Sequence, residues 1–132
     1  MRRSKLIFLP MVLISISNFI IAEDNEYVCK ELLSLETDLN KTLPQKLDEV
    51  TELTQLSVNC DTNTVKYSKR LLVELSLFSE GWVDRKQRQH TQLHCNASGL
   101  SSTYGWIAMD VIYDKNFKYL TTLQTEKTDC EK

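Results

Sequence analysis

The residues best suited to chemistry in this sequence are two histidines, His90 and His94. They stand four residues apart, a spacing that places two imidazoles on one face of a helix, where both could bind one metal ion. A zinc site normally needs three or four protein ligands, and no third ligand is evident in the sequence. We therefore interpret His90 and His94 as a pair of surface histidines, and we predict no metal site and no cofactor.

The four cysteines, Cys29, Cys60, Cys95 and Cys130, are the next candidates for chemistry. Their gaps of 31, 35 and 35 residues contain no Cys-x-x-Cys pair and do not resemble the spacing of zinc ligands. An even number of cysteines in a small exported chain indicates disulfides, because an oxidising compartment lets them persist. We predict two disulfides, for which three pairings exist. A disulfide-bonded Cys95 could not serve as a nucleophile beside His94.

The carboxylates show no catalytic pattern. Asp110 and Asp114 flank strand and turn positions, where solvation or turn chemistry explains them. A catalytic acid and base would need environments that separate their pKa values, and the sequence gives no sign of such burial. The chain has only three glycines, which argues against a glycine-rich phosphate-binding loop. We predict no catalytic residues and no enzyme activity.

The N-terminal segment has the features of an export signal. Three basic residues precede an apolar stretch that polar residues interrupt, and Ala22 ends this stretch just before an acidic segment. This pattern predicts a secretory signal peptide over residues 1–22, since a membrane anchor would need about 20 uninterrupted apolar residues. Cys29 lies seven residues beyond Ala22, so we expect no lipid-attachment site. The rest of the chain, 23–132, is expected to form one domain.

Cleavage at this point would change the charge balance. The first 22 residues hold three of the 16 basic residues and none of the 18 acidic ones, which leaves 110 residues with a net charge near −5. Such a balance disfavours nucleic acid and anionic membranes as partners. The notable basic cluster is Arg85, Lys86 and Arg88, which a solvated helix face would explain and which we keep as candidate partner-binding residues. We expect a periplasmic or secreted protein without a stable membrane anchor after signal cleavage.

Two helices are expected in the mature chain. Apolar residues recur at steps of three and four and predict a first helix with one apolar face, which Pro44 would end. They are Val28, Leu32, Leu35, Leu39 and Leu43. A second helix is expected from roughly Gly81 to Asn96, with a thin apolar face and a break at Asn96-Ala-Ser-Gly.

Two β-hairpins account for the remaining segments. Apolar and polar residues alternate from about Glu52 to Cys60 and again from Val65 to Val73, on either side of a turn at 61–63. The second hairpin is expected over residues 104–125, with its turn at Asp114-Lys-Asn-Phe.

The alternation of side chains along the first strand of the second hairpin determines which residues face solvent and could bind a partner. We expect Ile107, Met109 and Val111 to face the helices, which leaves Trp106 and Asp110 on the solvent side. An exposed tryptophan beside an unpaired strand is a feature of peptide-binding sheets. Trp106 and Asp110 are therefore candidate partner-binding residues, although ordinary core or edge packing would also explain Trp106.

The order helix, hairpin, helix, hairpin predicts an α+β fold of two layers, a four-stranded antiparallel sheet with two helices packed on one face. Its expected core residues are Leu32, Leu35, Leu39, Val58, Tyr67, Ile107, Met109 and Val111. In this fold Cys29 pairs naturally with Cys60, and Cys95 with Cys130, because each bond would tie a helix to its own neighbouring hairpin.

Several short stretches resemble small periplasmic α+β proteins, in particular the type II secretion pilotins of the AspS kind. The stretches are Leu43-Pro44, Thr54-Gln-Leu-Ser-Val, Asn63-Thr-Val-Lys-Tyr, the helix-borne Cys95, a glycine at 99 or 105, Ile112-Tyr113-Asp114 and the cysteine near the C-terminus. The resemblance implies a protein that binds a short segment of an outer-membrane secretin, and it implies the Cys95–Cys130 disulfide. Those pilotins are lipoproteins, whereas this chain lacks the acylated cysteine, so lipid-mediated piloting is not implied.

We therefore predict an exported, non-catalytic protein that binds another envelope or periplasmic protein, as an accessory or assembly factor of an envelope secretion system. The alternative is an inhibitor or immunity protein against a periplasmic toxin or hydrolase, for which small size, disulfides and an acidic surface are equally suitable. A small hydrolase is a third hypothesis, for which no nucleophile and base can be assembled. Asn40-Lys-Thr and Asn96-Ala-Ser would be glycosylation sequons in a eukaryote.

Overall fold

The structure, a computed structural model, describes residues 21–132. Most of the predicted signal peptide lies outside the described residues, so the signal peptide and the single mature domain stay predictions. In the part of the chain that is described, no helix is both long and apolar enough to cross a bilayer.

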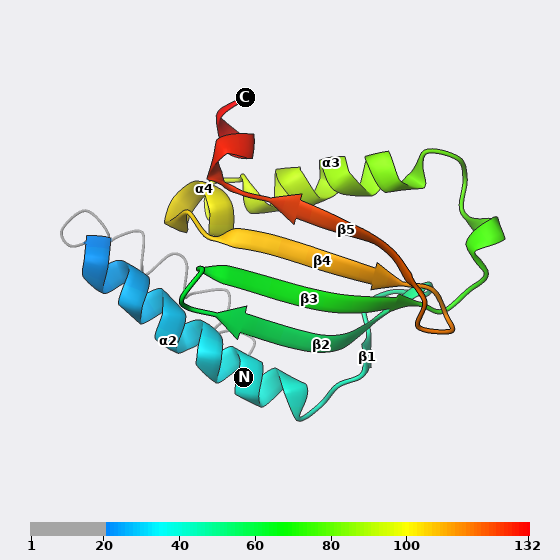
Figure 1. Ribbon diagram of the computed structural model, residues 1–132, viewed down its shortest axis with the longest axis horizontal. Coiled ribbons are helices and arrows are strands. Elements are labelled where there is room, and N and C mark those ends of the chain that lie inside the picture. The colour runs from blue at the N-terminus through cyan, green and yellow to red at the C-terminus, as the bar shows by residue number, and fades with distance from the viewer. Residues whose placement is uncertain (1–20) are drawn as a thin grey trace.

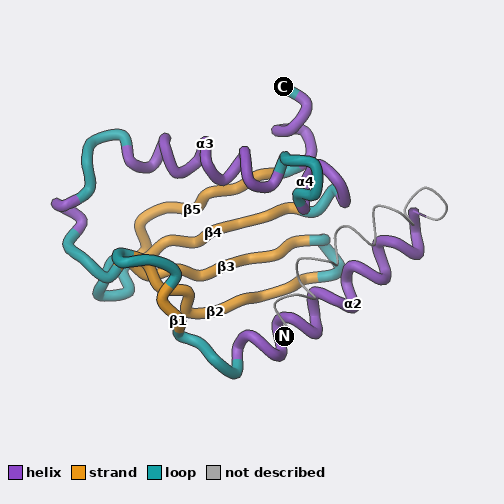
Figure 2. The backbone as a smooth tube through the Cα atoms, turned by 180° about the vertical axis from the view of Figure 1, so that it is seen from behind, coloured by secondary structure: helices purple, strands orange, loops and turns teal. Residues whose placement is uncertain are grey.

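Over residues 21–132 the chain forms helices and strands in the expected order, with four short additions: one strand, one α-helix and two 3-10 helices (Figures 1 and 2). The elements are α2 (Ile21–Asn40), β1 (Gln45–Lys46), β2 (Thr51–Asn59), β3 (Thr64–Leu71), the 3-10 helix η1 (Leu75–Leu77), α3 (Trp82–His94), α4 (Leu100–Tyr104), β4 (Ile107–Tyr113), β5 (Tyr119–Thr125) and the 3-10 helix η2 (Lys127–Glu131). The first helix ends before Leu43, and both β1 and α4 were missed by the sequence analysis.

The sheet has five strands in the order β1-β2-β3-β4-β5. β2 pairs with β3, and β4 with β5, in the antiparallel manner expected of two hairpins. β3 and β4 run parallel, with Val65 opposite Ala108 and Tyr67 opposite Asp110. The prediction of four antiparallel strands is therefore wrong. α3 lies between β3 and β4 in the sequence, and a helix is the usual connection that returns the chain to start a parallel strand.

The helices lie on one face of the sheet, as predicted. α2 packs against β2, α3 against β5 and α4 against β4 (Figure 1). The first core cluster joins Val28 and Leu32 of α2 to the strands, and the second lies under the start of α3. The buried members are Val28, Leu32, Leu56, Val65 and Trp106 in the first cluster and Leu71, Ile112 and Leu123 in the second.

The predicted core is correct for the first half of the chain and wrong for β4. Leu32 is buried, and the partly buried residues that pack against its cluster include Leu35, Leu39, Val58 and Tyr67. In β4 the buried residues are Ala108, Asp110 and Ile112, whereas Ile107, Met109 and Val111 alternate with them and are only half-buried. Side chains in a strand alternate between faces, so the second set points away from the helices.

Trp106, just before β4, is fully buried at 0% exposure instead of facing solvent. Trp106 belongs to the first core cluster, and its indole Nε1 donates a hydrogen bond of 2.9 Å to Asn25 Oδ1. An indole buries well when its N–H finds an acceptor, and Asn25 supplies one.

Both disulfides have the pairing that the sequence favoured. Cys29 of α2 bonds to Cys60 at the end of β2, and Cys95 at the end of α3 bonds to Cys130 of η2. Each bond therefore closes within one half of the molecule.

Candidate functional site

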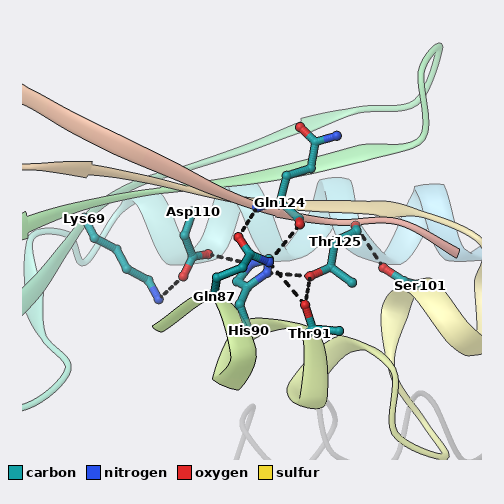
Figure 3. Close-up of polar contacts among 8 residues, drawn as sticks. All are labelled: Lys69, Gln87, His90, Thr91, Ser101, Asp110, Gln124 and Thr125. Atoms are coloured by element: carbon teal, nitrogen blue, oxygen red, sulfur yellow. Dashed lines mark hydrogen bonds and ion pairs between the residues drawn. The ribbon is translucent and has the colours of Figure 1, made fainter. Parts of the chain in front are cut away.

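A cluster of polar side chains lies between α3 and the sheet (Figure 3). We call Lys69 of β3, His90 of α3, Asp110 of β4 and Thr125 of β5 the polar cluster. Lys69 Nζ donates to Asp110 Oδ2 over 2.5 Å, and His90 Nε2 lies 3.4 Å from Asp110 Oδ1. On the other side of the imidazole, Nδ1 lies 2.8 Å from Thr125 Oγ1. Three strands and one helix thus each contribute one side chain to the polar cluster.

The two histidines are buried, at 4% exposure for His90 and 7% for His94, so their interpretation as surface residues is wrong. They lie one turn apart on α3, with ring centroids 4.6 Å apart. The thin apolar face of α3 explains this placement: Trp82 and Val83 cover the second core cluster, and the imidazoles continue the same side of the helix toward its end.

Burial and charge shift the pKa values around the cluster. Burial alone would raise the pKa of Asp110, but the contacts with His90 and Lys69 outweigh it and hold this pKa below its usual value. Burial, together with the neighbouring His90, lowers the pKa of His94 to about 4. Burial and the charge of Asp110 raise the pKa of Tyr67 to about 12. These shifts favour the ionised form of Asp110 and the neutral form of His94.

The order Asp110, His90, Thr125 resembles a carboxylate, imidazole and hydroxyl relay, so we tested it as a catalytic site. Thr125 has 0% exposure, and Ser101 Oγ donates to its carbonyl oxygen over 3.1 Å. The contact between His90 Nε2 and Asp110 does not reach hydrogen-bond geometry. A nucleophile must be reachable by its substrate, and the base that activates it must be oriented by a hydrogen bond to a third group. The polar cluster therefore fixes α3 to the sheet and offers no nucleophile to a substrate. Within residues 21–132, no group of three or more potential ligands is placed to hold a metal ion.

Sequence reasoning missed Lys69 and Thr125, although a signal for Lys69 was present. Lys69 stands in the alternating series Val65, Tyr67, Lys69, Leu71, of which Val65 and Leu71 are buried. A lysine on a buried face needs an anionic partner. Asp110 is the carboxylate within an apolar strand, so this pair could have been inferred. Thr125 carried no comparable signal.

The opposite face of the sheet carries an apolar strip. We define the apolar strip as Ile107, Met109, Val111 and Tyr113 of β4 together with Phe117 and Tyr119, which follow β4. The β4 residues are half-buried, Phe117 is 59% exposed, and the rings of Tyr113 and Tyr119 meet edge to face at 6.3 Å. Within the described chain, α2, α3 and α4 all pack on the other face.

An arginine supports the end of the strip. The guanidinium of Arg70 lies 4.8 Å from the centroid of the Phe117 ring, and its Nε donates to Glu52 Oε2 over 2.8 Å. Its Nη1 donates to the carbonyl oxygen of Lys115, also over 2.8 Å. Phe117 has a φ of 66°, a left-handed conformation that is unfavourable for a bulky residue. The contacts from Arg70 therefore help to hold an exposed ring in a strained turn.

The sequence-based candidates for partner binding divide into two groups. Trp106 and Asp110 are buried under the helices, so the expectation that they face solvent is wrong. Arg85 and Arg88 are exposed on α3 and Lys86 is half-buried. Arg85 donates to Ser79 Oγ and to the carbonyl oxygen of Glu80, and thus also fastens the start of α3. The structure does not bring the three basic residues together with Trp106 and Asp110 on one surface.

These features define a class of small two-layer α+β proteins in which a mixed sheet carries its helices on one face and each half is closed by its own disulfide. The fold is similar to that of EpsS, the pilotin of the Vibrio vulnificus type 2 secretion system, with a TM-score of 0.62 and 10% sequence identity. The match covers 83% of this chain and 96% of EpsS. At the level of fold, this confirms the resemblance to a type II secretion pilotin.

A second solved structure has the same fold. It is a Pseudomonas aeruginosa protein assigned as secreted, with a TM-score of 0.62, 14% identity, and coverage of 80% of this chain and 95% of that one. No family model matches the sequence, and no curated protein matches it.

Proposed function

We propose that this chain is an exported, non-catalytic protein that binds another envelope protein, as an accessory or assembly factor of a secretion system. The observation that carries the proposal is the fold shared with a pilotin over most of both chains. The two disulfides fit an oxidising compartment outside the cytoplasm. The hydroxyl of Thr125 is buried, so the polar cluster does not support the hypothesis of a small hydrolase.

The apolar strip is the surface that we propose for the partner. Strand β4 spans seven residues, which at about 3.3 Å per residue gives a strip of roughly 23 Å. Aromatic and arginine side chains carry much of the binding energy at protein interfaces, and Phe117, Tyr119 and Arg70 gather at one end. Lys66 is exposed and pairs in register with Met109. We therefore propose a partner segment that covers the strip with apolar residues and meets Lys66 with a carboxylate.

We propose the basic residues of α3, Arg85, Lys86 and Arg88, as a second partner contact that is separate from the apolar strip. Arg88 is exposed on the helix-bearing side. A partner that meets both Arg88 and the apolar strip would have to contact both faces of the sheet.

Binding can be tested with purified secretion-machine subunits and a matched pair of variants. Phe117→Ala combined with Tyr119→Ala should weaken binding at least tenfold, because truncation of aromatic anchors costs more than about 1–2 kcal/mol at an interface. Leu93→Ala is the control, since Leu93 is 60% exposed on α3, away from the strip. Equal loss in both variants would reject the strip as the binding surface. Binding to a toxin or wall hydrolase instead of a machine subunit would overturn the secretion role in favour of an inhibitor.

A further inference from the structure

A side-chain amide from a helix meets the part of β2 that the short β1 leaves unpaired, and another meets the edge strand β5. At the β2 edge, Asn40 Nδ2 donates to the carbonyl oxygen of Leu56 over 2.9 Å, and the Leu56 N–H donates to Asn40 Oδ1 over 3.0 Å. At the β5 edge, Gln87 Nε2 donates to the carbonyl oxygen of Gln124 over 3.0 Å, and the Gln124 N–H donates to Gln87 Oε1 over 3.3 Å (Figure 3). Each amide thus satisfies both backbone groups of one edge residue.

This arrangement imitates strand pairing. A carboxamide has the same acceptor and donor groups as a peptide unit, so it does for one edge residue what a neighbouring strand would do. Unpaired edges are templates for pairing with another chain, and proteins commonly block them. Asn40 ends α2 and Gln87 lies in α3, so the two halves of the molecule use the same solution independently.

The two edges are not equally protected. Along β2, the Val58 N–H also donates to Glu36 Oε2 over 2.9 Å, and β1 pairs with Leu53 and Glu52. Along β5, Gln87 is the amide that covers the edge. Thr122, two residues from Gln124, shares its outward backbone orientation and has no such contact from the described residues. The β5 edge therefore depends most on one side chain.

We propose that Asn40 and Gln87 are edge guards, which keep the sheet from pairing with a second copy of this chain. Without Gln87, the outward N–H and C=O groups of Thr122 and Gln124 would match the same groups of another β5 in an antiparallel pair. The guard at β2 is secondary, because Glu36 and β1 remain when Asn40 is removed.

The test compares Gln87→Ala with Gln92→Ala in the exported protein. Gln92 is exposed on the same helix, so both variants make the same chemical change. Sedimentation over a range of concentrations should show Gln87→Ala associating at least tenfold more strongly than the wild type, with Gln92→Ala unchanged. Hydrogen exchange should show the Thr122 and Gln124 amides becoming more protected as the concentration of Gln87→Ala rises.

Two results would overturn the proposal. In the first, sedimentation gives Gln87→Ala the same mass as the wild type at every concentration, while its Gln124 amide exchanges faster than in the wild type. The other is association that leaves the Thr122 and Gln124 amides unprotected.

A second variant keeps the test decisive if Gln87→Ala fails to fold. Gln87→Glu retains an acceptor for the Gln124 N–H and places a charge at the edge, which opposes strand pairing. It should remain as unassociated as the wild type, and strand-paired association of Gln87→Glu would contradict the proposal.

Discussion

Lys69 and Asp110 form a salt bridge beneath α3, with Lys69 Nζ 2.5 Å from Asp110 Oδ2, across the parallel pair of strands that joins the two halves of the sheet. The side chain of Asp110 is nearly buried and that of Lys69 is about a quarter exposed. Removing one partner of such a pair leaves an uncompensated charge, which costs more than the intact pair contributes.

We expect Asp110→Ala to lower the free energy of unfolding by about 3–5 kcal/mol, because it leaves Lys69 without its anion. Lys69→Met combined with Asp110→Ala should cost less than the sum of the two single changes, as measured by urea denaturation. Asp38→Ala, at an exposed position of α2, is the control and should change stability by no more than about 0.5 kcal/mol. If the loss in the free energy of unfolding for the double variant equals the sum of the losses for the two single variants, the two charges are not coupled.

Stability should fall in acid because of His94. The pKa of this residue is about 4 in the folded protein, below the ordinary value of 6.5, so the unfolded chain binds the proton more readily. The stabilisation is present above pH 6.5 and is lost as the pH falls toward 4. Asp110, whose pKa is lowered in the folded state, adds a further loss below the ordinary pKa of 3.8.

Thermal melts of the wild type and His94→Gln between pH 7 and 4 would measure this effect. The melting temperature of His94→Gln should depend less steeply on pH over this window. Parallel curves for the two proteins would show that His94 does not carry the acid sensitivity.

Trp106 gives a direct test of which side of β4 faces the helices. Trp82→Phe leaves Trp106 as the single tryptophan, since the chain has two. Its emission should be blue-shifted and poorly quenched by acrylamide, because the ring is fully buried. Trp106→Phe leaves Trp82, which is only partly buried and should be quenched more readily. Equal quenching of both proteins would contradict the placement.

Each disulfide closes a loop of similar length, with separations of 31 and 35 residues. The chain-entropy relation gives about 3–4 kcal/mol for loops of this size. We expect Cys29→Ser with Cys60→Ser, and Cys95→Ser with Cys130→Ser, to lower the free energy of unfolding by comparable amounts. Urea denaturation measures both, and a loss confined to one pair would show that the other bond does not stabilise the fold.

Much of the fold follows from local patterns. The apolar periodicity of α2 and the alternation in β2 and β3 predict these elements because each has one buried side and one exposed side. The cysteine pairing followed once each helix was assigned to its neighbouring hairpin. The direction of β4 relative to β3 could not be read in this way, because it depends on the path of α3 across the sheet.

The side of β4 that faces the helices was ambiguous for a physical reason. Both alternating sets are largely apolar, since Trp106, Ala108 and Ile112 stand against Ile107, Met109 and Val111. Asp110 made the first set look solvent-facing, and only a cation from another strand makes its burial acceptable. The polar cluster could not be predicted from the sequence either, because His90 and Asp110 become neighbours only after α3 packs on the sheet.

The two disulfides close within separate halves, so among residues 21–132 no covalent bond other than the main chain between β3 and α3 joins one half to the other. A protease cut in the segment at 72–81 would therefore yield two individually cross-linked fragments. Three contacts would still hold the fragments together: the β3–β4 hydrogen bonds, the Lys69–Asp110 pair and the packing of Trp106 against α2. The nicked molecule should migrate as one species under native conditions and as two in denaturant, with no reductant required.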